Sequence, residues 1–508
     1  MKKIILYNFV SFILLNVIFT GCTGKFEEIN SNPNNPEIVP ATNVLGACFK
    51  VGAGPVFDTR MSCYYAGTFC GMVSAVDYEY RASINNSMWE NIYIAMAYCV
   101  DAMKNAEREE NVNIYAAALT LKVFYAIKAT DCWGDIPYSE AFRLAEGVDY
   151  IYPKYDQQKD VYIQILAELK EAADKFDEQG PQLGVGDFLY KGDILKWKKF
   201  CNSLRLRAAI RACSGEVAVG QPTLVEVMGN PSKYPIILTN DANAYWQWPG
   251  NGVDEYWAAS MASRNDDGYR GDTGWRARQS FIDALQNNND PRMATYFELN
   301  SKGVYAGWIS GPDQKGGEDN NPINTSAFGD RFAGVAGVRG AFVPFFNAAE
   351  TYFNQAEAYL KGYVAGGDAK AEEAYVNGIN LSCEENSYKA SGAGTDNEIT
   401  QEMIDAFLNE PGVKWNGNAT PNADKIALQK WICMIKQSTE AWTEVRRTDV
   451  PKLLDVDIIY MLTHNRPPLR MPYSENEKNL NPNFPKDDPV RDLFWGQQLW
   501  WDKRTGVH

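Results

Sequence analysis

Apolar residues recur at three- and four-residue steps along much of this chain, which is the spacing of one face of an α-helix. The clearest run spans 88–108, and a second run spans 113–130. Because only a few residues separate them, we expect these two runs to form an antiparallel helical hairpin. Further runs with the same spacing predict helices at 161–176, 197–208, 345–363, 371–379 and 426–442. The pattern is that of a mostly α protein.

The predicted helices follow one another in pairs, with small residues at the expected crossings. This arrangement indicates a tetratricopeptide-like helical-pair scaffold, although the chain keeps no regular period of about 34 residues. We attribute the lost period to insertions between the pairs. The longest insertion spans 229–344, where Gly, Asn, Asp and Pro are frequent and helical spacing is weak. Long loop-rich segments are commonly functional, so we expect a loop-rich aromatic subdomain between helical scaffolds at 41–228 and 345–508.

The first residues of the chain follow a different pattern. Lys2 and Lys3 precede an apolar run, and small residues lead to Cys22. This order predicts a signal peptide at 1–21. The segment around Cys22 resembles a bacterial lipobox, with Phe19 where leucine is usual, and the resemblance implies that Cys22 carries a lipid such as palmitate. The alternative is an ordinary signal peptide with an incidental cysteine.

The stretch 22–40 is predicted to tether the lipid to the folded body. Asn and Pro crowd 30–36, and these residues favour turns and extended backbone. Glu27 and Glu28 lie just behind Cys22, an arrangement that resembles the surface-export signal of Bacteroidota lipoproteins; a solvated linker is the alternative. No later stretch holds the roughly 18 apolar residues of a membrane helix, so the lipid is the only membrane attachment we expect.

Composition and charge narrow the classes of function. The chain of 508 residues is 45% hydrophobic and carries a formal net charge of −15. An acidic surface repels phosphate backbones, so nucleic-acid binding is not expected. With only two histidines, His464 and His508, a histidine-based triad or zinc site is not expected either. The ten cysteines form no Cys-x-x-Cys pair, and we expect buried free thiols.

A long motif follows the second predicted helix. Residues 131–141 read Asp-Cys-Trp-Gly-Asp-Ile-Pro-Tyr-Ser-Glu-Ala, which resembles a signature segment of SusD/RagB-type lipoproteins. Segments similar to the family's other signatures follow in the family's order at 153–162, 192–207, 429–448, 467–475 and 499–502. The sequences Arg-Arg at 446–447 and Arg-Met-Pro-Tyr-Ser-Glu at 470–475 resemble those of the second SusD-like subgroup.

Most of these motif residues are predicted to be structural. Gly134 and Pro137 suit the end of a helix, because Gly adopts positive φ and Pro cannot continue the turn. We expect three arginines of one helix to form partly buried ion pairs with carboxylates such as Asp131 or Asp135. These arginines are Arg205, Arg207 and Arg211. Two tryptophans of the later motifs are expected in the core, Trp431 and Trp442.

The resemblance implies a surface-exposed outer-membrane lipoprotein that captures a glycan, either an oligosaccharide or a polysaccharide. It implies delivery of that glycan to a SusC-type TonB-dependent transporter, with the protein acting as a lid; the same mechanism would serve for oligopeptides. The partners that the resemblance implies are therefore the transporter and a glycan or peptide ligand. Members of this family are not enzymes and need no cofactor, and we predict neither activity nor cofactor here.

Two other classes of function stay open. One is a surface hydrolase, because 64 acidic residues can always supply a pair of catalytic carboxylates. The other is a protein-interaction module, since helical-repeat scaffolds commonly present such surfaces. Acidic residues also gather at 265–268 and 318–320, but neither segment has the spacing of an EF-hand loop. Solvated turns are expected there, and a structural calcium ion is left open.

We predict two segments that contact ligand. The first resembles in position the loop through which family members touch ligand, and its residues are Tyr78, Tyr80, Arg81, Asn85 and Trp89. The second is the aromatic-rich insertion, with Trp246, Trp248, Trp257, Arg264, Asp266, Trp275 and Trp308. Flat aromatic rings suit the apolar faces of sugars, and polar side chains suit their hydroxyl edges. For each tryptophan, packing in the core is the alternative.

Overall fold

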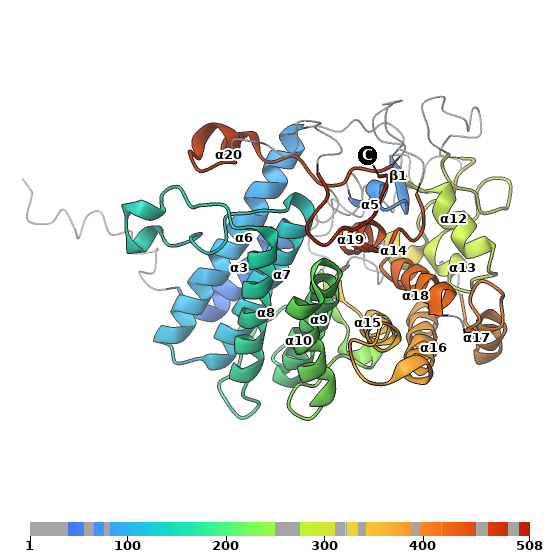
Figure 1. Ribbon diagram of the computed structural model, residues 1–508, viewed down its shortest axis with the longest axis horizontal. Helices are drawn as coiled ribbons and strands as arrows, with labels where there is room; N and C mark the ends of the chain where they lie inside the picture. Colours follow the sequence, from blue (N-terminus) through green and yellow to red (C-terminus); the bar gives the residue numbers. More distant parts are fainter. Residues whose placement is uncertain are drawn as a thin grey trace, which may run out of the picture. The chain divides into compact units, whose positions relative to one another are not determined.

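The structure, a computed structural model, describes residues 39–54, 66–75, 82–248, 275–309, 321, 323–333, 342–387, 397–417, 419–453, 466–485 and 497–507. Cys22 lies outside the described residues, as do the predicted signal peptide and almost all of the predicted tether. Ala41–His508 forms one compact unit. Figure 1 shows that this unit is built mainly from helices, which confirms the predicted fold class.

Helices of the N-terminal half lie side by side in sequence order (Figure 1). They are α3 (Ala41–Gly52), α6 (Ala82–Arg108), α7 (Val112–Trp133), α8 (Gln158–Lys175), α9 (Ile194–Gly215) and α10 (Val217–Gly229). From α6 to α10, each helix packs against the next one along the chain, and α3 packs against α6. The helices predicted at 88–108, 113–130, 161–176 and 197–208 are thereby confirmed, together with the first hairpin.

Helix α7 lies at the centre of this half. Its first turn is capped by Asn111, whose side chain accepts a hydrogen bond from the backbone of Ile114 at 3.0 Å. It ends at Gly134, where φ is 86° and the N–H donates to the carbonyl of Thr130, as the motif predicts. Among the described helices, α7 is long and apolar enough to cross a membrane, but 83% of that window is buried inside the fold. It is therefore a core helix of this unit.

The C-terminal half contains α15 (Ala348–Leu360), α16 (Gly367–Asn386), α17 (Gln401–Leu408), α18 (Ala419–Cys433), α19 (Ser438–Thr448) and α20 (Glu475–Leu480). Two sequence predictions are wrong in detail here. The run at 345–363 begins in a strand, and its helix starts only after Asn347, which caps the helix through Glu350. The run at 426–442 is two helices, because the backbone turns at Lys436 with a φ of 68°.

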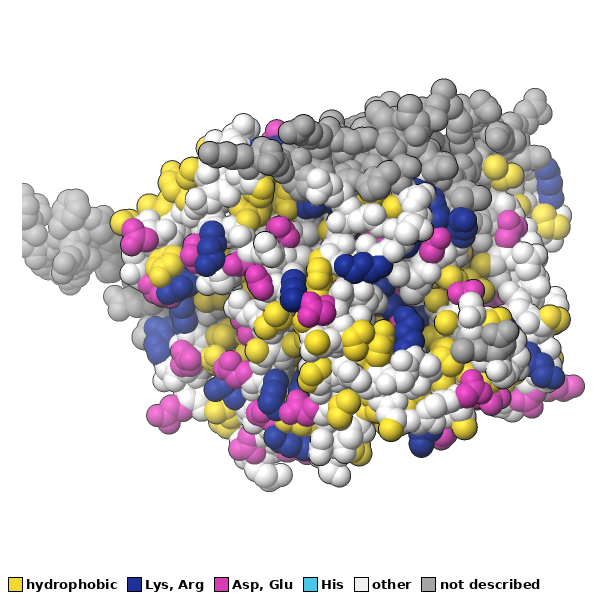
Figure 2. All heavy atoms as spheres, in the orientation of Figure 1, with side chains coloured by type: hydrophobic (Ala, Val, Ile, Leu, Met, Phe, Trp, Pro, Cys, Tyr) yellow, Lys and Arg dark blue, Asp and Glu magenta, His cyan; other side chains and the backbone are white. Residues whose placement is uncertain are grey.

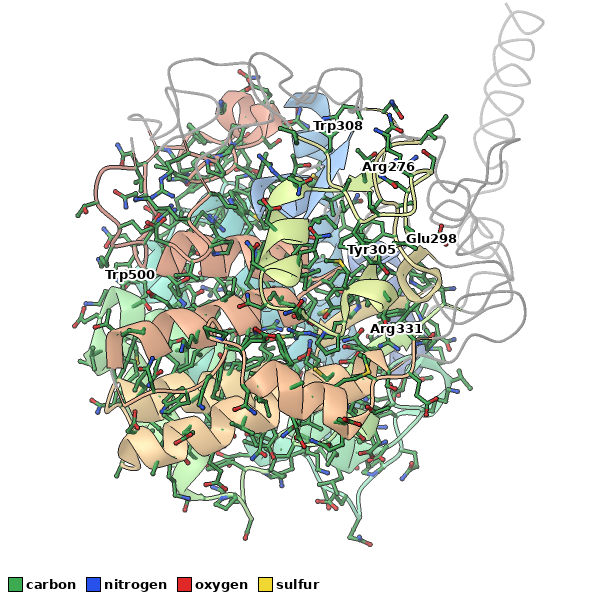
Figure 3. The ribbon with its side chains drawn as sticks, turned by 90° about the vertical axis from the view of Figure 1, so that its right-hand side faces the viewer. Arg276, Glu298, Tyr305, Trp308, Arg331 and Trp500 are labelled. Carbon is green, nitrogen blue, oxygen red and sulfur yellow. The ribbon has the colours of Figure 1, made fainter. Side chains whose placement is uncertain are left out.

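Short elements fill the described part of the loop-rich segment. They are β2 (Ala244–Gln247), β3 (Trp275–Ala277), α12 (Gln279–Gln286), α13 (Met293–Tyr296), α14 (Asp330–Ala333) and the first residues of β4 (Phe342–Phe346). An earlier segment supplies α5 (Ala66–Phe69) and β1 (Val73–Ala75), and β1 pairs antiparallel with β3. Figure 3 shows labelled side chains of this region on one side of the unit: Arg276, Glu298, Tyr305, Trp308 and Arg331. The predicted boundaries of the insertion stay a prediction.

Ion pairs inside the scaffold tie the two halves together. Arg211 of α9 pairs with Asp131 of α7 at 2.8 Å and with Glu440 of α19 at 2.6 Å. Arg207 forms two 2.6 Å hydrogen bonds to Glu350 of α15. The predicted partner Asp131 is thus confirmed for Arg211. The arginines are fully buried rather than partly buried, because they lie on helix faces that contact other helices.

The core and the surface follow the sequence pattern closely. Trp431 and Trp442 are 0% exposed, as predicted. Every cysteine in the described segments is a buried free thiol: Cys48, Cys70, Cys99, Cys132, Cys201, Cys213, Cys383 and Cys433. On the face shown in Figure 2, acidic and basic side chains are interspersed rather than gathered by sign. The described part of that face therefore offers no single-sign patch.

Candidate functional site

Strand β2 separates a buried face from a face that lines a pocket. It pairs antiparallel with β4, with Trp246 opposite Val343 and Gln247 opposite Phe342. Side chains alternate along a strand, so Trp246 points into the core, where its ring stacks on Phe188 at 5.6 Å. Tyr245 and Gln247 point to the other side, Tyr245 half-buried and Gln247 exposed.

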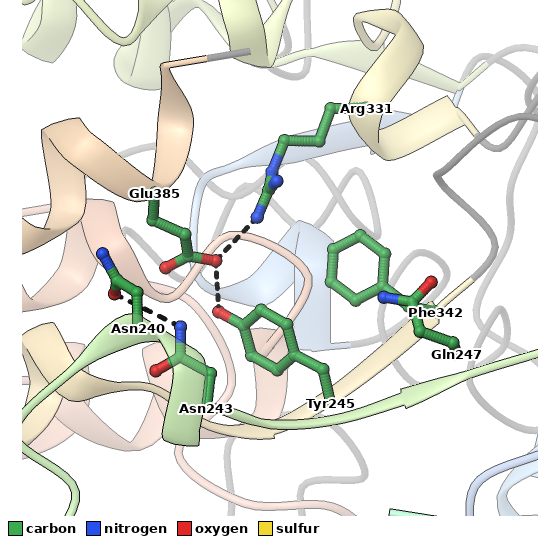
Figure 4. A pocket seen from close by; sticks show the side chains of 7 residues that line it. All are labelled: Asn240, Asn243, Tyr245, Gln247, Arg331, Phe342 and Glu385. Carbon is green, nitrogen blue, oxygen red and sulfur yellow. Dashed lines mark hydrogen bonds and ion pairs between the residues drawn. The ribbon is translucent and has the colours of Figure 1, made fainter. Parts of the chain in front are cut away.

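A pocket of about 440 Å³ lies on that other side (Figure 4). We call it the β2–β4 pocket, and it is lined by Asn240, Asn243, Tyr245, Gln247, Arg331, Phe342 and Glu385. These residues come from η5 (Asn240–Ala242) and the turn after it, from both strands, from α14 and from the last turn of α16. Segments more than a hundred residues apart in the sequence therefore build one site.

Glu385 is the polar centre of the pocket. Its Oε1 accepts a hydrogen bond from the hydroxyl of Tyr245 at 2.6 Å and pairs with Nη2 of Arg331 at 2.7 Å. Burial, followed by the charge of Glu385, raises the pKa of Tyr245 well above its usual value, so the hydroxyl stays protonated and donates. No described residue donates a hydrogen bond to Oε2 of Glu385, and that oxygen can accept one from a ligand.

An aromatic pair forms one wall of the same pocket. The rings of Tyr245 and Phe342 stack with centroids 5.2 Å apart and planes 27° from parallel. The guanidinium of Arg331 lies 5.7 Å from the ring centre of Phe342, within the range of a cation–π contact. The Nε of Arg331 is buried and has no hydrogen-bond partner among the described residues. Phe342 is 4% exposed and backs the half-buried ring of Tyr245, so Tyr245 supplies the accessible aromatic surface, beside the unpartnered Nε of Arg331.

Amide side chains form the rest of the rim. Asn240 donates to the carbonyl of Leu381 at 3.0 Å, and Asn243 accepts from the backbone of Ala348 at 2.8 Å. These bonds hold the two amides in place, while Gln247 is exposed. Within the described segments, no group of three His, Cys, Asp or Glu side chains could hold a metal ion. The arrangement suits non-covalent binding of a polar molecule with an apolar face.

The structure places several predicted ligand residues in the core. Trp89 is 4% exposed and packs edge-on against Trp133 at 5.1 Å. Trp246 and Trp248 are 3% and 6% exposed. A ring with so little exposed surface has no face to offer a sugar, so we do not carry these three into the proposed site. Packing, the alternative weighed for each tryptophan, is what the structure shows for them.

Trp308 is half-buried and lies on the same side of the unit as Arg331 (Figure 3). Its backbone bonds to Ala277 of β3 at 2.7 Å, which fixes the main chain at this position. The remaining predictions fall outside the described residues or concern side chains that are not described: Tyr78, Tyr80, Arg81, Asn85, Trp257, Arg264, Asp266 and Trp275. For these residues the prediction of ligand contact stays a prediction.

Sequence reasoning missed the residues that line the β2–β4 pocket. The alternation along β2 could have singled out Tyr245, since a buried Trp246 puts its neighbour on the opposite face. Arg331 and Glu385 carry no such signal. Each stands in an ordinary sequence context, and only the fold brings them within 2.7 Å of each other.

Comparison with known proteins agrees with this fold. A family model described as "Starch-binding associating with outer membrane", SusD-like_2, matches residues 58–474. The chain belongs to the SusD-like family. No curated relative matches the sequence. This SusD-like protein is also similar to solved structures, of which three are described below.

A protein titled Bacteroidetes AC2a SusD-like is 23% identical, with a TM-score of 0.72 over 92% of this chain and 100% of that one. A chitin-binding protein is 24% identical, with a TM-score of 0.73 over 91% and 99%. A chitin-binding SusD homolog from Flavobacterium johnsoniae is 22% identical, with a TM-score of 0.68 over 91% and 98%. At these identities the likeness shows the shared fold, and the family itself is associated with the outer membrane.

Proposed function

We propose that this SusD-like protein captures a glycan at the cell surface and delivers it to a SusC-type TonB-dependent transporter. The observation that carries the proposal is the β2–β4 pocket, where an aromatic wall stands beside a carboxylate, a guanidinium and amides. A sugar ring has an apolar face and a rim of hydroxyls, each of which donates and accepts. The pocket offers a complement to both features.

The pocket favours binding over chemistry. Glu385 is held by Tyr245 and by Arg331, so its charge is already compensated. A general acid or nucleophile of a glycoside hydrolase needs a second carboxylate across the sugar ring. The described residues that line this pocket include no second carboxylate. We therefore propose a binding protein rather than an enzyme, and we propose no cofactor.

Two of the solved relatives are described as chitin-binding, which supports a glycan over an oligopeptide as the ligand. The internal pairing of Arg331 and Glu385 points the same way, because neither charge is left to select an ionic peptide side chain. Oligopeptide capture remains the alternative, and the same binding assay separates the two when a peptide library is used beside a glycan array.

The test compares Tyr245→Ala with Tyr98→Ala in the full-length mature protein. Tyr98 is 38% exposed on α6 and takes no part in the pocket. Removing a stacking ring at the centre of a site should weaken binding of the best glycan from the array about tenfold or more. Tyr98→Ala should bind that glycan as wild type does. Equal affinity for both variants, measured by titration calorimetry, would place the glycan site elsewhere.

We further propose that Cys22 carries the lipid that holds the protein at the outer membrane, facing the exterior. The supporting observation is the signal-like order of basic, apolar and small residues before that cysteine. Cys22→Ser should shift the protein from the membrane fraction to the soluble fraction. Retention of the variant in the membrane would contradict the proposed anchor.

A further inference from the structure

A second pocket lies where the end of α7, the start of α8 and the C-terminal segment meet. It has a volume of about 230 Å³ and is lined in part by Asp135, Gln158, Arg470, Tyr473 and Trp500. Figure 3 shows Trp500 on the side opposite Arg331, which lines the β2–β4 pocket. We call it the Arg470 pocket. The two pockets share no described lining residue, so an inference about the Arg470 pocket stands apart from the proposed glycan site.

Arg470 has no carboxylate partner among the described residues. Buried Arg446 has none there either, but its guanidinium donates to the carbonyls of Trp442 and Leu469. Arg470 is 5% exposed, and its Nη2 donates to the hydroxyl of Tyr473 at 2.7 Å. Its Nε is buried without a hydrogen-bond partner, and no residue in the described segments accepts from Nη1 or forms an ion pair with it. Leaving a buried charge without a counter-ion is costly. By contrast, Arg211 pairs with carboxylates through all three of its guanidinium nitrogens.

The surrounding backbone leaves room for this guanidinium. Gly134 adopts a φ of 86°, and a Cβ placed there would lie 3.0 Å from Nη2 of Arg470. The hydroxyl of Tyr473 in turn donates to the carbonyl of Asp135 at 2.8 Å, which fixes the orientation of the Arg470–Tyr473 pair. Arg470 is therefore held in place at a polar cavity by one hydroxyl, with donors to spare.

Asp135 supplies an acceptor in the same cavity. One of its oxygens accepts from the backbone of Gln158 at 2.8 Å, and the other accepts from no described residue. Burial raises the pKa of this carboxyl, and a hydrogen-bond donor from a ligand would stabilise its charged form. Arg470 lines the same cavity, and its charge partly offsets the effect of burial on the Asp135 pKa. A cation and an anion thus line the same small cavity.

We propose that the Arg470 pocket binds a small carboxylate that carries an N–H or O–H donor beside it. The ligand carboxylate would pair with the free donors of Arg470, since guanidinium and carboxylate match in geometry and charge. The adjacent donor would bond to Asp135. α-Amino acids and sugar acids share this chemistry, and the volume of about 230 Å³ suits one such unit.

The test uses four probes on the full-length mature protein: glycine, D-galacturonate, propionate and inorganic phosphate. Glycine and galacturonate carry a donor near the carboxylate, propionate carries none, and phosphate tests for simple anion binding. We expect saturable binding of glycine or galacturonate at millimolar concentration, seen by calorimetry or ligand-observed NMR. The probe that binds identifies the source as an amino acid or a sugar acid. Propionate should bind more weakly because it leaves Asp135 unfilled.

Three variants decide the assignment. Arg470→Gln should weaken binding of the best probe about tenfold or more, whereas Arg143→Gln, at an exposed ion pair, should leave it unchanged. Asp135→Asn should weaken that probe but leave propionate unaffected. Arg470→Gln should also keep or raise the melting temperature, because it removes a buried charge that has no counter-ion. This last result separates a ligand-binding arginine from a structural one.

Several outcomes would overturn the proposal. They are the absence of binding by glycine and galacturonate alike, unchanged binding in Arg470→Gln, and binding of phosphate in preference to both carboxylates. Should Arg470→Gln fail to fold, Arg470 is structural, and Asp135→Asn then tests the remaining half of the site. Failure here leaves the glycan proposal intact, because that proposal depends on Tyr245 and its neighbours.

Discussion

The buried ion pairs of the helical scaffold and the ion pair of the β2–β4 pocket use the same side chains in opposite ways. Arg211 is 0% exposed, and its nitrogens lie within ion-pair distance of three carboxylates. The side chains of Arg331 and Glu385 are 18% and 13% exposed, and each keeps an atom without a partner among the described residues. The fully buried pairs of Arg211 hold helices together, whereas a partly exposed pair that lines a pocket can still bind a ligand.

Position in the fold explains the difference. Arg211 lies on α9 and is fully buried, and its guanidinium pairs with carboxylates of α7 and α19. Arg331 and Glu385 lie at the ends of short or terminating helices beside a strand pair, where the chain leaves space. We infer that stability resides in the first region and ligand recognition in the second, and each prediction below tests that division.

The largest effect is expected from Arg211→Met. The substitution keeps much of the side-chain length but leaves Asp131 buried without its cation and leaves Glu440 with Arg207 alone. Breaking a buried pair in this way should lower the free energy of unfolding by about 3–5 kcal/mol. Arg143→Met is the matched control at an exposed pair with Glu146, and it should cost less than about 1 kcal/mol. Denaturant unfolding measures the loss of unfolding free energy in both variants. Equal losses in Arg211→Met and Arg143→Met would contradict the prediction.

A somewhat smaller effect should follow from pH. Burial alone would raise the pKa of Glu440, but the charges of Arg207 and Arg211 outweigh it and lower that pKa from 4.5 to about 2. A carboxylate whose pKa is lowered in the folded state contributes its full stabilisation of that state above its pKa in the unfolded chain. This contribution is lost as the pH falls toward the pKa in the folded state. We therefore expect stability to fall between pH 4.5 and pH 2, by roughly 3 kcal/mol from this group.

Glu440→Gln is the matching variant, because it cannot titrate. It should be less stable than wild type at neutral pH and should show a flatter pH dependence between those two limits. Glu146→Gln, at the exposed pair, should keep the wild-type profile. A wild-type stability that does not change on acidification, measured by unfolding at a series of pH values, would contradict a stabilising role for the buried network.

The same division explains what the sequence could predict. The helices at 88–108 and 113–130 and the scaffold role of Arg211 follow from periodicity and from motifs whose residues are close together in the chain. The break at Lys436 was missed, because the apolar spacing continues across it while the backbone turns. Apolar periodicity reports burial, and it does not report whether one helix or two provide the buried face.

The sequence predicts the chemistry of the ligand site but not the residues that line the β2–β4 pocket. Aromatic residues in a loop-rich stretch indicated sugar chemistry, but counting tryptophans favoured Trp246 and Trp248, which pack in the core. Large aromatic rings stabilise cores as effectively as they bind ligands, so their frequency does not separate the two roles. Glu385 comes to Tyr245 from 140 residues away, and no local pattern marks such a contact.

The smallest effect, and the sharpest test of the pocket, is expected from Tyr245→Phe. This change keeps the ring that stacks on Phe342 and removes only the hydroxyl that donates to Glu385 at 2.6 Å. Glu385 keeps Arg331, so the loss of one donor should change the free energy of unfolding by only about 1 kcal/mol. Glycan affinity should fall several-fold, less than in Tyr245→Ala, because the stacking face remains.

Tyr115→Phe is the matched control, since Tyr115 donates to Glu171 at 3.0 Å on the exposed surface of α7 and α8. It should change neither glycan affinity nor stability beyond a fraction of a kcal/mol, about what exposed polar pairs contribute. If Tyr245→Phe instead destabilises the protein as much as Arg211→Met does, the pocket pair is part of the scaffold, and the division between the two regions is wrong. If affinity and stability are both unchanged, the ring alone serves the ligand, and the hydroxyl has no part in recognition.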